Sequence, residues 1–445
     1  MTPYQRMAKG LAAALAGPPW GAEAEAGLVV SGREALGRRP RWLRPLVRRL
    51  LKAFPEDRPR VPEVAAFLAT DGTLREAWSE EPFPLRAPSG RPSMAPAAGP
   101  PSAWPVPAIV TPAELADRLG LDPGELDWFA DLRGLERATA EGPLRHYDYR
   151  WVPKRDGSSR LIEAPKARLK AIQRRVLREV LAAIPPHDAA HGFRPGRSVR
   201  SFVEPHAGRA VVLKLDLADF FPTILRARVI ALFRTAGYPE GVAEALAGLC
   251  TNRVPSSLWR RPDAPASDSE ARRTRLLYGK AHLPQGAPTS LTLANLGAYR
   301  LDCRLTGLAA SAEARYTRYA DDLAFSGDAD FARSVDRFRV HVAAIILEEG
   351  FRPNFRKTRV MGRAARQCLA GAVLNDRPNI PRDDFDALKA TLHNCARHGP
   401  EPQNRSAHPD FRAHLLGRIA HVGTLNPARA GKLKVLFDRV DWQPA

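Results

Sequence analysis

The chain has 445 residues, enough for roughly two to four domains, and 44% of them are hydrophobic, enough to build packed cores. Its formal net charge of +20 favours a polyanionic partner, so nucleic acid is favoured over a membrane, and no apolar run approaches the roughly 20 residues that span a bilayer. The four cysteines form no Cys-x-x-Cys pair, which is typical of the reducing cytoplasm and leaves no evident zinc or iron–sulfur framework.

The N-terminal region carries helical and basic patterns. A short apolar run at residues 11–16 follows two cations and imitates a secretion signal, but its length and the intracellular character of the remaining chain argue against export. Residues 38–52 are amphipathic: their Trp, Leu and Val positions predict a packed stripe, and their arginines suit a phosphate backbone. A solvated surface helix and a membrane-surface role are the alternatives. The proline-rich residues 81–108 predict an extended linker.

The next region opens with a helix start. Thr111 as N-cap, Pro112 at the first position and Glu114 at the third predict a capping box. A second short helical pattern follows, so the pair fits either a helix-turn-helix or a helical lead-in to the segments beyond. Residues 146–163 then alternate as a β-hairpin with cations on both arms, and residues 167–181 predict an amphipathic helix.

Two segments then offer candidate functional residues. A glycine- and arginine-rich loop at residues 191–198 contains Arg194 and Arg197. The apolar run after residue 210 predicts a buried strand that ends in a carboxylate, Asp216, and an open sheet places a metal ligand in this way. Phe221 follows five positions later.

Helical residues continue to about Cys250, and the polar, basic residues 251–281 predict a flexible insertion. A turn-rich loop with Gln285 and Gly286 then opens a helix. Residues 331–349 have helical spacing, and a further pair of strands is expected after them.

Two adjacent carboxylates, Asp321 and Asp322, stand between strand-forming residues, which predicts the tight turn of a β-hairpin facing a cleft. Like charges repel, but a pair of divalent cations about 4 Å apart would neutralise them and drive phosphoryl chemistry. Adjacent acids at an ordinary solvated turn are the alternative.

The last region predicts two or three helices rich in arginine, lysine and histidine. It contains the pattern His393-x-Cys395-x-x-His398, which offers three side chains of the kind that bind metals. Because no fourth ligand is in view, we do not expect a metal there.

Three of these segments, in this order, resemble the palm motifs of reverse transcriptases: Asp216-Leu217-Ala218-Asp219-Phe220-Phe221, Leu283-Pro284-Gln285-Gly286 and Tyr319-Ala320-Asp321-Asp322. The resemblance covers about residues 110–435 and is closest to bacterial retron-type enzymes. The loop at Arg194 is similar to one in retron and group II intron enzymes, and the helices after Thr111 resemble the retron lead-in. Two signatures depart from the family: Leu369-Ala370-Gly371 stands in place of Val-Thr-Gly, and only His206 matches Asn-Ala-x-x-His.

The resemblance implies an α+β fold. This would be a right-hand polymerase with fingers, a ferredoxin-like palm built on a split β-α-β antiparallel sheet, and a helical thumb, plus a basic N-terminal extension. The implied regions are the extension at 1–80, the linker at 81–108, the lead-in and fingers at 109–210, the palm at 211–382 with an insertion at 251–281, and the thumb at 383–445.

The resemblance also implies a role for each motif residue. Asp216, Asp321 and Asp322 would hold two Mg²⁺ ions, with Mn²⁺ as an alternative, and Lys357 would protonate the departing pyrophosphate. The residues that would bind the nucleotide are Lys154, Arg160, Phe221, Gln285 and Gly286, of which Phe221 would exclude a ribose 2′-hydroxyl. The residues that would contact nucleic acid are Arg194, Arg197, His206 and Tyr319.

A retron-type enzyme would be a cytoplasmic RNA-directed DNA polymerase. It would copy part of a cognate structured RNA into a short single-stranded DNA linked to RNA (msDNA), using deoxynucleoside triphosphates and forming an RNA–DNA hybrid. A retron effector or toxin protein would be a further partner, in defence against phage, and no membrane is involved. Two alternatives are a group II intron-like or other domesticated reverse transcriptase, for which a Cys/His endonuclease tail is missing, and a non-catalytic RNA-binding protein with a relic palm, in which the acids would be idle.

Overall fold

The computed structural model describes residues 2–16, 20, 24–55, 59, 61–85, 93–95, 104–139, 142–153, 159–261, 264 and 269–442. The chain divides into two compact units, Met1–Ser93 and Met94–Ala445. The division falls within the stretch predicted as a linker, but residues near both ends of that stretch are packed. Phe83 belongs to the core of the first unit, and Trp104 and Val106 pack on the core of the second.

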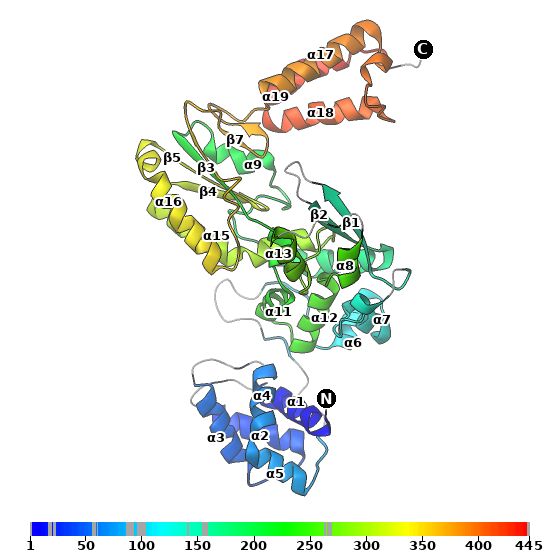
Figure 1. The fold of residues 1–445 in the computed structure, drawn as a ribbon, viewed down its shortest axis with the longest axis vertical. Helices are drawn as coiled ribbons and strands as arrows, with labels where there is room; N and C mark the ends of the chain where they lie inside the picture. Colours follow the sequence, from blue (N-terminus) through cyan, green and yellow to red (C-terminus); the bar gives the residue numbers. More distant parts are fainter. Residues whose placement is uncertain are drawn as a thin grey trace. The chain divides into compact units, whose positions relative to one another are not determined.

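The first unit is a bundle of helices around one apolar core (Figure 1). Its helices are α1 Pro3–Leu15, α2 Ala24–Leu36, α3 Leu43–Ala53, α4 Val61–Thr70 and α5 Gly72–Glu80. The predicted basic amphipathic segment is confirmed as α3, in which Leu46 and Leu50 are fully buried. Arg44 and Arg48 lie outside the core and both pair with Glu25 of α2, at 3.0 and 3.1 Å.

The second unit begins with two short helices, α6 Pro112–Leu119 and α7 Pro123–Ala130. The helix start at Thr111 is confirmed, since its hydroxyl accepts a hydrogen bond from the Glu114 N–H at 3.1 Å. The capping box is displaced by one residue, because the Glu114 carboxylate accepts from the Val110 N–H at 2.9 Å. Both helices contribute to the main apolar core of this unit, which favours the lead-in over a separate helix-turn-helix.

The predicted hairpin is confirmed as β1 Tyr147–Pro153 and β2 Ser159–Pro165, paired antiparallel. The predicted helix after it is α8 Ala167–Glu179. Where the sequence predicts one helix up to Cys250, the structure has three. The backbone is extended at Ile224 and Leu225, and Gly237, with a φ of 104°, and Pro239 separate the last two helices. They are α10 Phe220–Thr223, α11 Arg226–Thr235 and α12 Glu240–Cys250.

The stretch predicted as a flexible insertion contains a helix, α13 Ser269–Tyr278. Leu258 and Tyr278 are buried against Trp151 and Leu161 of the β1–β2 hairpin. This apolar contact places the described part of 251–281 on the hairpin. The sequence pattern did not show it, because the partners lie about a hundred residues upstream.

A four-stranded antiparallel sheet forms the centre of the second unit, in the order β4-β5-β3-β6. Its strands are β3 Val211–Asp216, β4 Arg315–Tyr319, β5 Asp322–Gly327 and β6 Arg359–Gly362. The connecting helices are α14 Ser290–Gly297, α15 Tyr299–Ser311 and α16 Ala329–Glu348. This connectivity is a split β-α-β arrangement, with α15 and α16 on one face of the sheet (Figure 1).

Alternation along the strands divides the core into two layers. Leu213 and Phe325 belong to the core that includes α15 and α16, whereas Val212 and Ala324 belong to the core on the opposite face. The second core is shared with three C-terminal helices, α17 Arg382–His398, α18 Phe411–Leu425 and α19 Pro427–Phe437, as the sequence predicts. The remaining short elements are α9 Val199–Val203, β7 Cys368–Leu369, β8 Ala372–Val373 and 3₁₀ turns at Glu136–Ala138, Leu181–Ala183, Glu204–His206, Ser256–Arg260 and Glu401–Gln403.

The Cys395 side chain of α17 is buried in the core that the C-terminal helices share, so it does not face solvent.

Among the residues that the structure describes, no helix is long and apolar enough to cross a membrane.

Candidate active site

Three carboxylates meet at one end of the central sheet. Asp216 is the last residue of β3, and it pairs in register with Asp322, the first residue of β5. Ala320 and Asp321 form the two-residue turn between β4 and β5, which confirms the predicted hairpin turn. Ala320 has a φ of 54°, an uncommon conformation for a residue with a side chain. The turn is therefore held in a backbone geometry that its surroundings must support.

Two of the acids have cationic partners. Asp216 is 5% exposed and accepts from the Asn354 side-chain amide and from the Lys357 amino group, each at 3.0 Å. Asp322 pairs with the Lys214 amino group at 2.9 Å. Lys357 thus lies beside the acids, while its role as a proton donor stays a prediction. Asn354 and Lys214 were missed, although Lys214 lies two residues before Asp216 and therefore on the same strand face.

Asp321 is the acid that the protein's own cations leave least compensated. Among the described residues, no lysine or arginine lies within ion-pair distance of its carboxylate. Burial, together with the charges of Asp216 and Asp322, raises the pKa of Asp321 from 3.8 to about 6. Two lysines facing three acids leave an excess of negative charge, so this end of the sheet favours added cations.

The donor set fits hard divalent cations, because Mg²⁺ and Mn²⁺ prefer carboxylate oxygens. In the described part of the chain, however, no group of three or more His, Cys, Asp or Glu side chains is arranged to hold a metal ion. Lys357 and Lys214 each bind one carboxylate oxygen, of Asp216 and Asp322 respectively.

The Gln285–Gly286 loop lies against β2. The Gln285 carbonyl accepts a hydrogen bond from the Glu163 N–H at 2.9 Å, and this bond attaches the loop to the edge of the hairpin. Gly286 has a φ of 137°, and a Cβ at this position would lie 2.9 Å from the Glu163 carbonyl oxygen. Only glycine fits this close approach.

The resemblance implies that this loop binds the nucleotide. On that basis we expect Gly286→Ala to raise the KM for deoxynucleotides roughly tenfold, because the loop must move away from Glu163 to accept the methyl group. Primer extension at varied nucleotide concentration measures this. Gly307→Ala is the matched control, since a Cβ there meets no atom within 4 Å. An unchanged KM in Gly286→Ala would contradict the expectation.

A buried ion pair lies directly beneath this loop. Glu163 accepts from His282 Nε2 at 3.0 Å and from the Asn252 amide at 2.7 Å, and both Glu163 and His282 are fully buried. The other ring nitrogen of His282 lies 2.6 Å from the Lys280 carbonyl oxygen. Burial would lower the pKa of His282, but the charge of Glu163 and these hydrogen bonds outweigh it and raise the pKa. No local sequence pattern indicates this pair.

The other predicted nucleotide-binding residues are placed as follows. Arg160 is exposed on β2, whereas Lys154 lies outside the described residues. Phe221 is half-buried and packs on Phe220 with ring centroids 5.6 Å apart. One part of the Phe221 side chain therefore packs in the core, and the other part is open to solvent.

His206 does not fit the expected contact with nucleic acid. It is fully buried, and its ring nitrogens bond the hydroxyls of Ser326 and Thr317, each at 2.7 Å. Burial lowers the pKa of His206 to about 3, so the ring is neutral. His206 therefore links β4 and β5 from beneath the sheet.

The remaining candidates for nucleic acid contact reach the surface. Tyr319 is half-buried between Phe193 and Phe202, with ring centroids 5.7 Å from each. Arg194 and Arg197 are partly exposed and share Asp188, at 3.3 and 4.0 Å.

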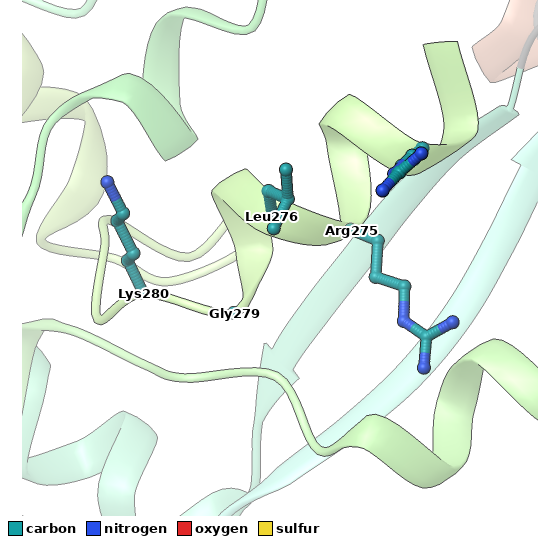
Figure 2. Close-up of a pocket in the computed structure, with 5 residues that line it drawn as sticks. Arg275, Leu276, Gly279 and Lys280 are labelled. Carbon is teal, nitrogen blue, oxygen red and sulfur yellow. The ribbon is translucent and has the colours of Figure 1, made fainter. Parts of the chain in front are cut away.

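A second cationic feature lies on α13 and the turn after it. A cavity of about 440 Å³ is lined by Arg272, Arg275, Leu276, Gly279 and Lys280 (Figure 2). Arg273 of the same helix pairs with Asp219, three residues beyond Asp216. The helix is thus attached close to the acids while three other cations line the hollow.

These features correspond to a known family. The family model described as reverse transcriptase (RNA-dependent DNA polymerase) matches residues 152–376, just over half of the chain. That range includes the central sheet and all three acids, so both lie within the part of the chain that matches this family.

Similar proteins narrow the assignment. Retron Mx65 reverse transcriptase of Myxococcus xanthus is 42% identical over 328 residues, covering 74% of this chain and 71% of that protein. Retron Mx162 reverse transcriptase of the same species is 38% identical, covering 71% and 64%, and retron Ec86 reverse transcriptase of Escherichia coli is 33% identical, covering 53% and 64%. The chain thus spans less than two thirds of the last two relatives. The protein belongs to the reverse transcriptase family as a bacterial retron-type enzyme, an RNA-directed DNA polymerase.

Among solved structures, a prototype foamy virus protease–reverse transcriptase aligns with 68% of this chain and 34% of its own, at 14% identity and a TM-score of 0.27.

Proposed function

We propose that this enzyme copies part of a cognate structured RNA into a short single-stranded DNA that stays linked to RNA, and that this msDNA acts in antiphage defence with an effector or toxin protein. The observation that carries the proposal is the cluster of Asp216, Asp321 and Asp322, whose charge the neighbouring lysines only partly neutralise. The similarity to retron enzymes supports the type of product.

The regions take polymerase roles in this proposal. The β4-β5-β3-β6 sheet with α15 and α16 is the palm, the β1–β2 hairpin and the helices packed behind it are the fingers, and α17 to α19 are the thumb. The α13 segment is an insertion between fingers and palm. The N-terminal bundle is a basic extension, joined to the rest by the linker at 81–108.

The three aspartates would hold two divalent ions, Mg²⁺ or Mn²⁺. Such ions, when bound, lower the pKa of the primer hydroxyl and neutralise charge on the triphosphate. Lys357, held 3.0 Å from Asp216, is the protein's own proton donor for the leaving pyrophosphate. Its ammonium form is favoured there, because the Asp216 hydrogen bond and the charges of the acids outweigh the effect of burial and raise the pKa of Lys357.

Two sets of residues bind the nucleotide and the template in this proposal. The nucleotide-binding set is Lys154, Arg160, Phe221, Gln285 and Gly286, with Phe221 closing the space beside the sugar. Arg194, Arg197 and Tyr319 contact the template strand, and the cations at the α13 cavity offer a further surface for its phosphates.

Polymerase activity is expected to fall as the pH drops through about 6, because the pKa of Asp321 lies there and protonation removes the charge that attracts the cations. Below that point the rate of single-nucleotide extension should fall about tenfold per pH unit. Added Mg²⁺ should move the midpoint to lower pH, since cation and proton compete for the carboxylate. A rate that stays constant down to pH 5 would contradict this assignment.

The product is tested on enzyme purified from cells that carry the native locus. Nucleic acid extracted from it is run on a denaturing gel with and without RNase and DNase. A discrete short DNA that shifts but survives RNase supports the msDNA proposal, and its loss in Asp321→Asn ties it to this site. In the opposite outcome, the enzyme carries only RNA and still extends a primer on an RNA template. That result would support the polymerase activity and refute the msDNA product. Phage plating on cells lacking the gene tests the defence role.

A further inference from the structure

A buried arginine lies directly beneath the catalytic turn. Arg318 is the residue of β4 just before Tyr319, and its side chain is fully buried. Its Nε and Nη2 donate to the two carboxylate oxygens of Asp302 on α15, at 2.8 and 2.6 Å, and Asp302 is also fully buried. The guanidinium of Arg318 and the carboxylate of Asp302 thus form a bidentate ion pair in the core, where neither group is exposed to solvent.

The remaining guanidinium nitrogen reaches the turn itself. Nη1 of Arg318 donates to the Ala320 carbonyl at 3.1 Å and to the Asn295 side-chain oxygen on α14 at 2.9 Å. The Ala320 carbonyl belongs to the peptide that leads into Asp321. Holding this oxygen therefore fixes the peptide plane from which the Asp321 side chain starts.

The backbone of Arg318 is held as well. Its N–H donates to the Ala189 carbonyl, and its carbonyl accepts from the His191 N–H, both at 2.7 Å. Gly192, next in that loop, comes so close that an added Cβ would lie 2.9 Å from the Ala320 nitrogen. The turn is thus enclosed between this loop and the guanidinium.

Stability alone does not explain such a pair. Burying both charges carries a desolvation penalty that apolar residues of similar volume avoid, so replacing a buried ion pair with apolar residues is often neutral or stabilising. The pair does fix the orientation of the Arg318 guanidinium. An arginine with four of its donor hydrogens engaged, on α15, α14 and the turn, allows one orientation, and Ala320 keeps its positive φ there.

We propose that Arg318, oriented by Asp302 and Asn295, is a positioning residue that holds the Ala320–Asp321 turn so that Asp321 and Asp322 act together with Asp216. The inference rests on the proposed catalytic role of these acids. Arg318 itself touches neither nucleotide nor nucleic acid, being fully enclosed.

The test compares three variants with the full-length enzyme. Arg318→Lys keeps a charge for Asp302 but lacks the fork that reaches Ala320. The double variant Arg318→Met/Asp302→Leu removes both buried charges and keeps the volume. Leu305→Ala is the stability control, because Leu305 is fully buried on the same helix as Asp302 but is not part of the hydrogen-bond network. Melting temperature, kcat and KM for deoxynucleotides, and Mn²⁺ affinity by electron paramagnetic resonance are measured for each.

We expect kcat of both Arg318 variants to fall about 100-fold or more, with KM for nucleotides within about twofold of the wild type, because a misplaced group slows chemistry more than binding. Mn²⁺ affinity should fall roughly tenfold or more in the same variants. Leu305→Ala should lose melting temperature, yet keep kcat within about threefold and bind Mn²⁺ normally. The double variant should stay inactive even where its melting temperature matches the wild type.

A folded Arg318 variant with near wild-type kcat and Mn²⁺ affinity would overturn the inference and leave the ion pair a purely structural feature. Loss of kcat in proportion to melting temperature, equal in Leu305→Ala, would do the same. A wild-type enzyme that neither extends primers nor binds Mn²⁺ would instead refute the proposed function of the acids, and the positioning role would fall with it.

Discussion

Asp321→Asn is expected to abolish DNA synthesis while making the folded protein more stable. The rate of primer extension should fall on the order of 10³-fold or more, because the substitution removes one of three carboxylates that meet at the end of β3 and the β4–β5 turn. Asp336→Asn is the control, since that side chain is 78% exposed on α16. Activity within about tenfold of the wild type in Asp321→Asn would contradict the assignment.

The stability part follows from the raised pKa of Asp321. Burial and two neighbouring carboxylates place this pKa at about 6 in the folded protein, against 3.8 in the reference state. The folded state therefore holds the proton more tightly, so its stability falls as the pH rises between these values, and the loss is complete above about 6. In EDTA at pH 7.5 we expect a higher melting temperature for Asp321→Asn than for the wild type, and the difference should shrink toward pH 5. An equal or lower melting temperature at pH 7.5 would show that the acids do not repel one another.

Phe221→Ala is expected to let the enzyme incorporate ribonucleotides. The half-buried ring packs on Phe220, and Phe221 follows Asp216 by five residues, so removing the ring opens space beside the proposed sugar position. The preference for deoxynucleotides over ribonucleotides, taken as the ratio of kcat/KM values, should drop roughly 100-fold.

Single-nucleotide extension with each nucleotide type measures this ratio. Leu347→Ala is the control, because this side chain is 56% exposed on α16 and should leave the ratio unchanged. If a folded, active Phe221→Ala enzyme kept the same preference for deoxynucleotides over ribonucleotides, the result would contradict the role in sugar selection and leave Phe221 with a packing role only.

Much of the site was predictable because its signals are local. An apolar run that ends in an acid predicts a strand that delivers Asp216, and two acids between β-forming residues predict the turn at Asp321. The structure confirms both. Helices α3, α8 and α16 were likewise predictable, since apolar residues repeat with helical spacing.

Other residues were misjudged because their environment is built from distant parts of the chain. His206 matches a motif position and was expected at the surface, but Ser326 and Thr317, more than a hundred residues away, enclose it. The stretch 251–281 looks like a flexible insertion from its polar composition, yet Tyr278 packs on the β1–β2 hairpin.

The sequence by itself determined the class of protein and predicted which acids form its site, because the spacing and order of short motifs can be recognised without knowledge of the fold. Only the tertiary structure decided how those acids are held and charged. No local pattern singles out Arg318, which is buried against Asp302 only because α15 packs on the sheet. Likewise the pKa of Asp321 depends on Asp216 reaching it through strand pairing. Burial and charge proximity arise from long-range contacts, which local sequence patterns do not contain.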